Sequence, residues 1–194
     1  MACIDAIEQQ GTYSIAGLIG LDEEMHTVCC GYRVVGTDAK LSGMRQLYAN
    51  AHIAIGQIKT AVLRKTLFEK LVKIGFNMPV IVSPFAYVSK HANIGAGSIV
   101  MHGAIVNAGA QIGKNCIVNS RALIEHDCSV ANHCHIATGA IINGGVTINE
   151  SSFIGSGSVV KEGVNIGVGC LVGMGLSLRH DLVDSDRFVK AQAI

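Results

Sequence analysis

The sequence predicts a mixed fold, in which a small N-terminal α/β unit is followed by a parallel β-helix. Residues 81–182 divide into seventeen consecutive units of six residues, and the second place of every unit is aliphatic. The sixth place is Ala, Ser or Cys in thirteen of these units. Residues 1–80 lack this period and alternate helical with strand-like patterns. We therefore expect an α/β unit over 1–80, a β-helix over 81–182 and a C-terminal tail over 183–194.

The period of six residues is the feature that indicates a β-helix. An amphipathic α-helix repeats its apolar residues at spacings of three and four, which does not give one large aliphatic residue in every six. A short strand followed by a turn does give it, and three such units close one triangular coil, stacked on the next at about 4.8 Å. The aliphatic place then fills the prism, and the narrow corners require a small sixth residue. Each coil buries its apolar surface only against its neighbours.

The N-terminal patterns predict two helices and two strands. Residues 4–9 are expected to be helical, and residues 13–21 (YSIAGLIGL) to form a buried strand. Residues 52–56 (HIAIG) predict a second strand after a mixed stretch. Thr60 is expected to cap a second helix that ends at Gly75. The buried face of this helix is expected to carry Leu63, Leu67, Leu71 and Ile74. Such alternation is typical of a small parallel α/β unit.

Composition and charge exclude several classes of function. The net charge is +1 and basic residues are scattered, whereas a nucleic-acid-binding protein gathers them on one face. No apolar run reaches the roughly 18 residues that cross a bilayer. The N-terminus also lacks the basic-then-apolar pattern of a signal peptide. We expect a cytoplasmic protein that binds neither nucleic acid nor membrane.

The seven cysteines predict neither disulfides nor a metal site. Four of them occupy the small, inward sixth place of a repeat unit, where free cysteine packs as a small hydrophobic residue: Cys116, Cys128, Cys134 and Cys170. The other three lie outside the repeat and show no ligand spacing: Cys3, Cys29 and Cys30.

The chain resembles the hexapeptide-repeat acyltransferases, and among them the NeuD/PglD-type sugar acetyltransferases. The resemblance covers nearly the whole chain and rests mainly on IAGLIGLDEE (15–24), IAIGQ (53–57) and IVNSRALIEHDCSVANHCHIATGAIINGG (117–145). It implies a left-handed β-helix and a homotrimer with active sites between subunits. It also implies acetyl transfer from acetyl-CoA to the amine of a nucleotide-linked 4-amino sugar, or alternatively to a hydroxyl of a sialic acid or related sugar.

The sequence departs from that family at both ends. Family members usually begin with a strand and a glycine-rich G-x-x-G-H turn, whose backbone N–H groups bind phosphates, before the first helix. This sequence starts inside that helix, so the Rossmann-like unit is expected to lack its first strand. The C-terminal DSDRFVKAQAI lacks the G-x-P-A ending that lies near the CoA adenine in the family.

His126 is the candidate catalytic base. Acetyl transfer from a thioester requires a base for the attacking amine or hydroxyl and donors for the tetrahedral oxyanion. His126 stands outside the aliphatic column, between Glu125 and Asp127. A neighbouring carboxylate can fix the tautomer of an imidazole and raise its basicity. By itself the pattern leaves open a solvated corner histidine; the resemblance implies that His126 is the base and that Asp127 orients it.

The resemblance also implies residues that bind the co-substrate. His135 and Asn119 would contact acetyl-CoA or the acceptor, and Gly144 and Gly145 would offer N–H groups to the oxyanion. Each has a simpler interpretation, because His135 can pack at a subunit interface and the others can be ordinary corner residues. Several further residues are weaker candidates: His102, His133, His180, Lys161 and Arg179.

Four residues of the N-terminal unit are candidates for binding the acceptor: Asp22, Glu23, Gly56 and Gln57. They follow the carboxyl ends of the two predicted strands, where open α/β sheets bind their ligands. The resemblance implies contact with the sugar acceptor, and ordinary loop polarity is the alternative.

Two other classes of function stay open at this point. A hydratase of the γ-carbonic-anhydrase type needs three histidines on zinc. The chain has eight histidines but not that class's closely spaced pair across two units, so we expect no metal. A non-catalytic trimeric scaffold is the other alternative, and stabilisation by acetyl-CoA would argue against it.

Overall fold

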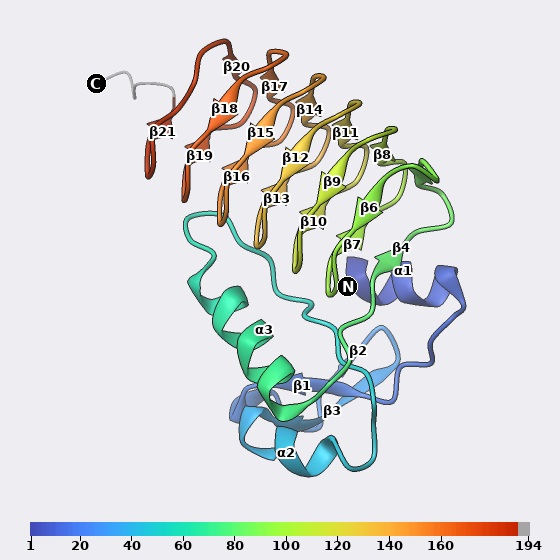
Figure 1. Cartoon of the computed structure of the whole chain (residues 1–194). Helices are drawn as coiled ribbons and strands as arrows, with labels where there is room; N and C mark the ends of the chain where they lie inside the picture. The colour runs from blue at the N-terminus through green and yellow to red at the C-terminus, as the bar shows by residue number, and fades with distance from the viewer. Residues whose placement is uncertain (190–194) are drawn as a thin grey trace.

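The computed structural model describes residues 1–189 and shows two parts, a small N-terminal unit and a stack of short strands (Figure 1). The N-terminal unit contains α1 (Ala2–Gln10), β1 (Leu18–Gly20), η1 (Asp22–Glu24), β2 (Val28–Cys29), β3 (Tyr32–Thr37), η2 (Asp38–Lys40), α2 (Leu41–Met44) and α3 (Val62–Ile74). Its sheet has the order β1-β3-β2, with β1 parallel and β2 antiparallel to β3.

The stack consists of two-residue strands, which begin every six residues except for the last, β21. They are β4 (Ile81–Val82), β5 (Tyr87–Val88), β6 (Asn93–Ile94), β7 (Ile99–Val100), β8 (Ile105–Val106), β9 (Gln111–Ile112), β10 (Ile117–Val118), β11 (Leu123–Ile124), β12 (Ser129–Val130), β13 (His135–Ile136), β14 (Ile141–Ile142), β15 (Thr147–Ile148), β16 (Phe153–Ile154), β17 (Val159–Val160), β18 (Asn165–Ile166), β19 (Leu171–Val172), β20 (Ser177–Leu178) and β21 (Arg187–Phe188). Strands eighteen residues apart pair in parallel, as Ile117 does with His135.

Three parallel sheets therefore enclose a triangular prism, and the predicted left-handed β-helix is confirmed. The aliphatic second places point inward and form its core, with Val118, Ile136 and Ile154 all fully buried. The four cysteines at the sixth place are buried and free, as expected. β21 pairs with β19, so the sheet continues into the stretch 183–194; the last five residues of that predicted tail lie outside the described residues.

The outward first places distinguish the three faces of the prism. The covered face, formed by β4, β7, β10, β13, β16, β19 and β21, presents Ile81, Ile99, Ile117, His135, Phe153 and Leu171, and ends with Arg187. The open apolar face, formed by β5, β8, β11, β14, β17 and β20, presents Tyr87, Ile105, Leu123, Ile141 and Val159, and ends with Ser177. The polar face, formed by β6, β9, β12, β15 and β18, presents Asn93, Gln111, Ser129, Thr147 and Asn165.

The N-terminal unit lies against the covered face. Ile81 and Ile99 are each only 1% exposed because α1 packs on them with Ala6, Cys3 and Ile7. In Figure 1 the whole unit lies on this one side of the stack. The docking explains why an outward column of the solenoid is apolar there, since it is an internal interface.

Three predictions for the N-terminal unit are wrong in detail. The strand expected over 13–21 is regular only at β1, and residues 52–56 are extended but form no strand. These two stretches line one largely apolar cavity of about 490 Å³, which lies between them, so neither gains a sheet partner on that side. On α3, Leu63 is 63% exposed, and the buried residues are Arg64, Phe68 and Leu71. Thr60 does accept the Val62 N–H, and Gly75 ends the helix with φ +98°.

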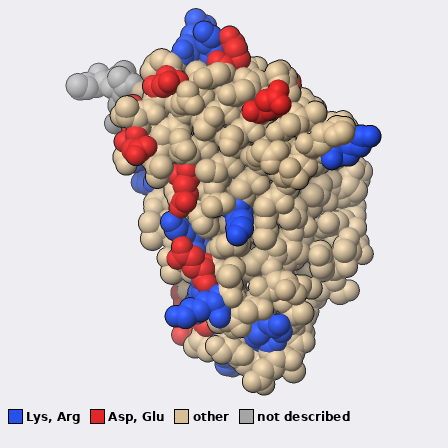
Figure 2. All heavy atoms as spheres, viewed as in Figure 1, with Lys and Arg blue, Asp and Glu red and all other residues tan. Residues whose placement is uncertain are grey.

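The charged side chains on the face seen in Figure 2 are of both signs and interspersed. Within residues 1–189 no helix is long and apolar enough to cross a membrane.

Candidate active site

His126 lies on the corner of the prism between the open apolar face and the polar face. It lies in the turn between β11, which ends at Ile124, and β12, which begins at Ser129. Its side chain is 67% exposed, and its Nδ1 lies 2.9 Å from Oδ2 of Asp127. A carboxylate can only accept in this bond, so Nδ1 carries a proton, and in the neutral imidazole Nε2 keeps its lone pair. The geometry suits a base whose reactive nitrogen faces outward.

Asp127 and Glu125 are held by the neighbouring coil. Asp127 adopts a left-handed conformation (φ +59°) and donates its N–H to the Ala108 carbonyl (3.1 Å). Glu125 accepts a hydrogen bond from Asn107 Nδ2 at 2.8 Å and does not contact His126. Of the two acids that flank the imidazole, Asp127 alone is therefore its partner.

Gly144 stacks one coil from His126, at the place where the next corner turns. A methyl group on Gly144 would lie 2.7 Å from Nε2 of His126, so the absent side chain leaves this nitrogen open. The N–H of Gly145 donates to the His126 carbonyl (3.0 Å), which corrects the expectation that Gly145 offers it to an oxyanion. In residues 1–189 the N–H of Gly144 has no acceptor and remains a free donor.

His135 begins β13 on the covered face and is buried beneath the N-terminal unit. Its Nδ1 donates to the main-chain carbonyl of Gln57 (2.7 Å), and Asn119 Nδ2 lies 3.3 Å from its Nε2. Burial lowers the pKa of His135, so the imidazole is neutral near pH 7. Gln57 is itself buried and donates from Nε2 to the His133 carbonyl (2.7 Å).

Within one chain the two predicted histidines do not meet. The corner that carries His126 joins the open apolar and polar faces, which places it opposite the covered face that carries His135. Asn119 lies with His135, whereas Gly144 lies with His126. The candidate site of a single chain therefore consists of two separated halves.

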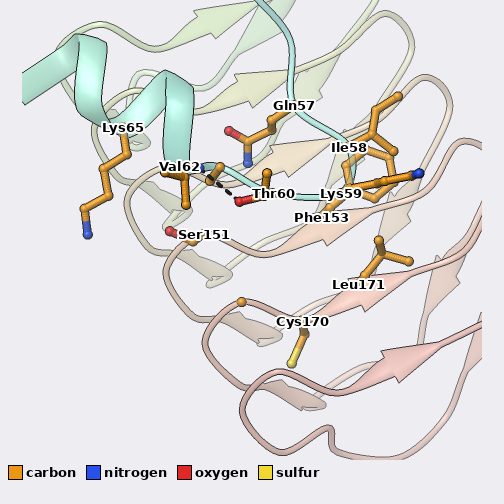
Figure 3. Close-up of a pocket in the computed structure, with 12 residues that line it drawn as sticks. Gln57, Ile58, Lys59, Thr60, Val62, Lys65, Ser151, Phe153, Cys170 and Leu171 are labelled. Carbon is orange, nitrogen blue, oxygen red and sulfur yellow. Dashed lines mark hydrogen bonds between the residues drawn. The ribbon is translucent and has the colours of Figure 1, made fainter.

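A cavity of about 290 Å³ adjoins the half that contains His135 (Figure 3). Gln57, Lys59 and Thr60 reach it from the loop before α3, and Ser151, Phe153 and Leu171 reach it from the coils. Phe153 also packs edge-on against His135, with ring centroids 5.2 Å apart. The cavity thus combines an apolar wall with cationic and hydroxyl groups.

Lys65 also lines this cavity, from the first turn of α3, and it pairs with Glu150 (2.6 Å). The hydrogen bond between them raises the pKa of Lys65 and lowers that of Glu150. Sequence reasoning missed Lys59, Thr60, Lys65 and Phe153. The available signal was Phe153, an aromatic ring in the outward first place of a repeat unit.

Of the predicted acceptor-binding residues, Gln57 alone lines this cavity. Asp22 and Glu23 are exposed in η1, and Gly56 is exposed in the loop before α3. Within the described part of the chain, Asp22, Glu23 and Gly56 make no hydrogen bonds to one another.

Comparison with known proteins gives the chain its family. Its structure matches the acetyltransferase domain of PglB from Neisseria gonorrhoeae FA1090 in complex with acetyl coenzyme A, with 30% identity over 96% of this chain and 88% of that one and a TM-score of 0.87. It also matches PerB from Caulobacter crescentus in complex with CoA and GDP-perosamine, with 33% identity over 96% and 86% of the two chains and a TM-score of 0.89. The chain belongs to the hexapeptide-repeat acetyltransferases.

A third solved structure, WeeI from Acinetobacter baumannii AYE, is 25% identical over 95% of this chain and 89% of that one, with a TM-score of 0.81. No family model and no curated protein sequence matches the chain. These matches confirm the family and the enzyme class that we predicted from the six-residue repeat and the E-H-D element.

The weaker candidates have structural partners in this acetyltransferase. His102 bridges Ser83 Oγ and Asp5 Oδ2, at 2.6 Å each, and so fastens α1 to the first coils. His133 lies 2.9 Å from Asn115 Nδ2, and His180 packs on Phe188. Lys161 and Arg179 are exposed. Among residues 1–189 no three histidine, cysteine or acidic side chains converge as a metal site.

Proposed function

We propose that this enzyme transfers acetyl from acetyl-CoA to the amine of a nucleotide-linked 4-amino sugar. The observation that carries the proposal is the open Nε2 of His126, which Asp127 orients beside the free N–H of Gly144. Solved structures that match 86–88% of their length to this chain are described in complex with acetyl-CoA, or with CoA and GDP-perosamine. Two of the Caulobacter crescentus structures carry a replacement of one histidine.

The reaction follows from these groups. The neutral amine of the sugar attacks the thioester carbonyl carbon, and Nε2 of His126 accepts the proton that the nitrogen loses. The carbonyl oxygen becomes an oxyanion, which the N–H of Gly144 stabilises. Collapse of the tetrahedral intermediate breaks the C–S bond and releases CoA, which takes the proton from His126. The products are the acetamido sugar and CoA.

We infer that the working enzyme is a homotrimer with its active sites between subunits. The open apolar face exposes large side chains, among them Tyr87 (58% exposed) and Ile105 (39%). A continuous column of outward apolar side chains supports an interface on this face. Its edge is the corner that carries His126, so a neighbouring subunit packed on it would bring its own surface beside the base. This arrangement would join the two halves of the site, with His135 and Asn119 coming from one subunit and His126 and Gly144 from the other.

The cavity beside Gln57 is the proposed acceptor site. Lys59 and the hydroxyl groups of Thr60 and Ser151 suit the phosphates and hydroxyls of a nucleotide sugar. Phe153 and Leu171 offer an apolar surface to a base or sugar ring. Asp22, Glu23 and Gly56 would contact the parts of the acceptor that extend beyond this cavity. Because the reaction consumes acetyl-CoA, we expect it to take place in the cytoplasm.

The test is an assay with acetyl-CoA and two groups of acceptors, nucleotide-linked 4-amino sugars and sialic acids. We expect an N-acetylated nucleotide sugar, identified by mass spectrometry and by its resistance to mild alkaline hydrolysis, which removes O-acetyl esters. O-acetylation of sialic acid with no reaction of the amino sugars would overturn the proposal. Thermal stabilisation by acetyl-CoA measures co-substrate binding independently of the acceptor.

A further inference from the structure

The carboxylate of Asp127 rests on a residue that has no side chain. Gly109 occupies the same corner place one coil earlier, and an added methyl group there would overlap Oδ1 of Asp127. The methyl group would also lie 3.3 Å from the Asp127 main-chain nitrogen and 3.3 Å from its Cγ. The backbone at that place cannot give way easily, because the Gly109 N–H is bonded to the His91 carbonyl (3.2 Å) and the Asp127 N–H to the Ala108 carbonyl (3.1 Å).

Backbone conformation does not explain why this residue is glycine. Gly109 has φ +79°, in the left-handed region, but other corners hold ordinary residues there. The equivalent places of other units carry Asn115, Arg121, Asp127, His133 and Ser151, with φ between +55° and +64°. Left-handed conformation is costly for such residues, yet the coil supports it repeatedly.

The same corner supplies a comparison without the contact. Gly145 and Gly163 occupy the equivalent place two and three coils after Gly109, with φ +69° and +70°. A methyl group on either would meet no atom within 4 Å. What distinguishes Gly109 from these two is therefore the Asp127 carboxylate that lies on it.

We propose that Gly109 is a positioning residue for the catalytic pair of His126 and Asp127. Because Gly109 has no side chain, the Asp127 carboxylate can occupy the space above it, and from there it points at Nδ1 of His126. The inference rests on the proposed role of His126 as base. A side chain at 109 would push the carboxylate out of this space, because the end of a side chain moves more easily than the backbone of the coil. The imidazole would then lose the acceptor that fixes its tautomer and orientation.

The test compares Gly109→Ala with Gly163→Ala, alone and in an Asp127→Ala background. Both alanines should lower Tm by a similar amount, a few degrees, because each imposes the same left-handed conformation. Gly109→Ala should lower kcat at least tenfold, without raising KM for acetyl-CoA. In the Asp127→Ala background it should change kcat less than twofold, since the displaced group is gone. Equal fold-losses in both backgrounds, or full activity of Gly109→Ala together with an unchanged His126 tautomer, would overturn the proposal.

A measurement that does not use activity separates this inference from the proposed function. In wild type, long-range ¹H–¹⁵N NMR should show the neutral His126 imidazole protonated at Nδ1, and in Gly109→Ala it should show a tautomer mixture. If the tautomer shifts while acetyl transfer is unaffected, Gly109 does position the pair and His126 is not the base. An unchanged tautomer in Gly109→Ala would show that Gly109 does not position the Asp127 carboxylate.

Discussion

Nδ1 of His135, on the β-helix, donates a hydrogen bond of 2.7 Å to the main-chain oxygen of Gln57, in the loop before α3. The two residues are far apart in sequence, and their bond joins the parts of the molecule that we expect to bind co-substrate and acceptor. It leaves Nε2 of the neutral imidazole as an acceptor, which Asn119 Nδ2 approaches to 3.3 Å. His126 is the opposite case, because it is exposed, held by its own neighbour in sequence and open at Nε2.

The first prediction concerns the base. His126→Ala should lower kcat by about 10²–10⁴-fold, the range in which general-base groups contribute. Its Tm should change little, because the side chain is 67% exposed. Steady-state kinetics with acetyl-CoA, together with a thermal melt, measure both. Near-full activity of a folded variant would reject His126 as the base.

Gly144→Ala should block the open side of the imidazole. The new methyl group would lie 2.7 Å from Nε2 and 2.8 Å from Cε1 of His126, so we expect a loss in kcat on the order of 10². The fold should tolerate alanine, because Ala108, two coils earlier, and Glu162, one coil later, occupy the same corner place. A matched substitution, Glu162→Ala, controls for changes in the corner itself. Full activity of Gly144→Ala would show that the reaction does not take place beside Nε2 of His126.

A charge on the open apolar face should dissociate the oligomer. Ile105→Asp introduces a carboxylate into the exposed column, where it would be buried without a partner in a trimer. Ser129→Asp makes the same change in the first place of the polar face and should leave the assembly intact. Light scattering after gel filtration gives both masses. Equal masses for the two variants would show that this face is not the subunit interface.

The buried histidines should make the fold sensitive to acid. Burial lowers the pKa of His133 and His135, and that of His52 to about 4, whereas an unfolded histidine titrates near 6.5. Below pH 6.5 the unfolded chain therefore binds more protons at these histidines than the folded chain does. The free energy of unfolding falls as the pH falls toward 4. Each such histidine contributes up to about 1.4 kcal/mol per pH unit.

The variant His52→Leu tests the largest of these shifts. Both ring nitrogens of His52 are buried and make no well-formed hydrogen bond, although the Pro79 carbonyl partly offsets the effect of burial on the pKa, so leucine removes the acid-sensitive group at little cost in hydrogen bonding. Urea unfolding at several pH values between 7 and 5 should show a smaller pH slope than wild type. An unchanged slope would mean that His52 titrates alike in both states.

Adjacent cations on α3 should differ greatly in their effect on stability. Arg64 is 1% exposed, donates to the carbonyls of Ile53 and Ile55 at 2.7 Å each, and has a pKa that burial lowers to about 10. Arg64→Met should cost on the order of 3 kcal/mol, because it leaves two carbonyls unpaired. Lys65→Met removes the half-exposed pair with Glu150 and should cost about 1 kcal/mol or less. Equal losses in chemical denaturation would contradict this order.

The β-helix could be read from the sequence because every coil repeats one local rule. Six-residue spacing fixed the inward places, the small corner residues and the buried Cys116 and Cys170, and it placed His126 on an outer corner. The N-terminal unit was predicted less well, since residues 13–17 and 52–56 have strand-like patterns but no partner that would make them regular. Leu63 was assigned to the buried face of α3 from periodicity, whereas the docked face is the one that carries Arg64 and Phe68.

The sequence by itself determined the prism, its apolar core and the exposed imidazole with its carboxylate neighbour, because these depend on contacts within one coil or between adjacent coils. Tertiary structure alone decided which face of the prism is covered and that His135 is buried against Gln57. These features arise from the docking of residues 1–80 on a surface far away in the chain. Such docking depends on the shape of two finished units, which no local spacing encodes.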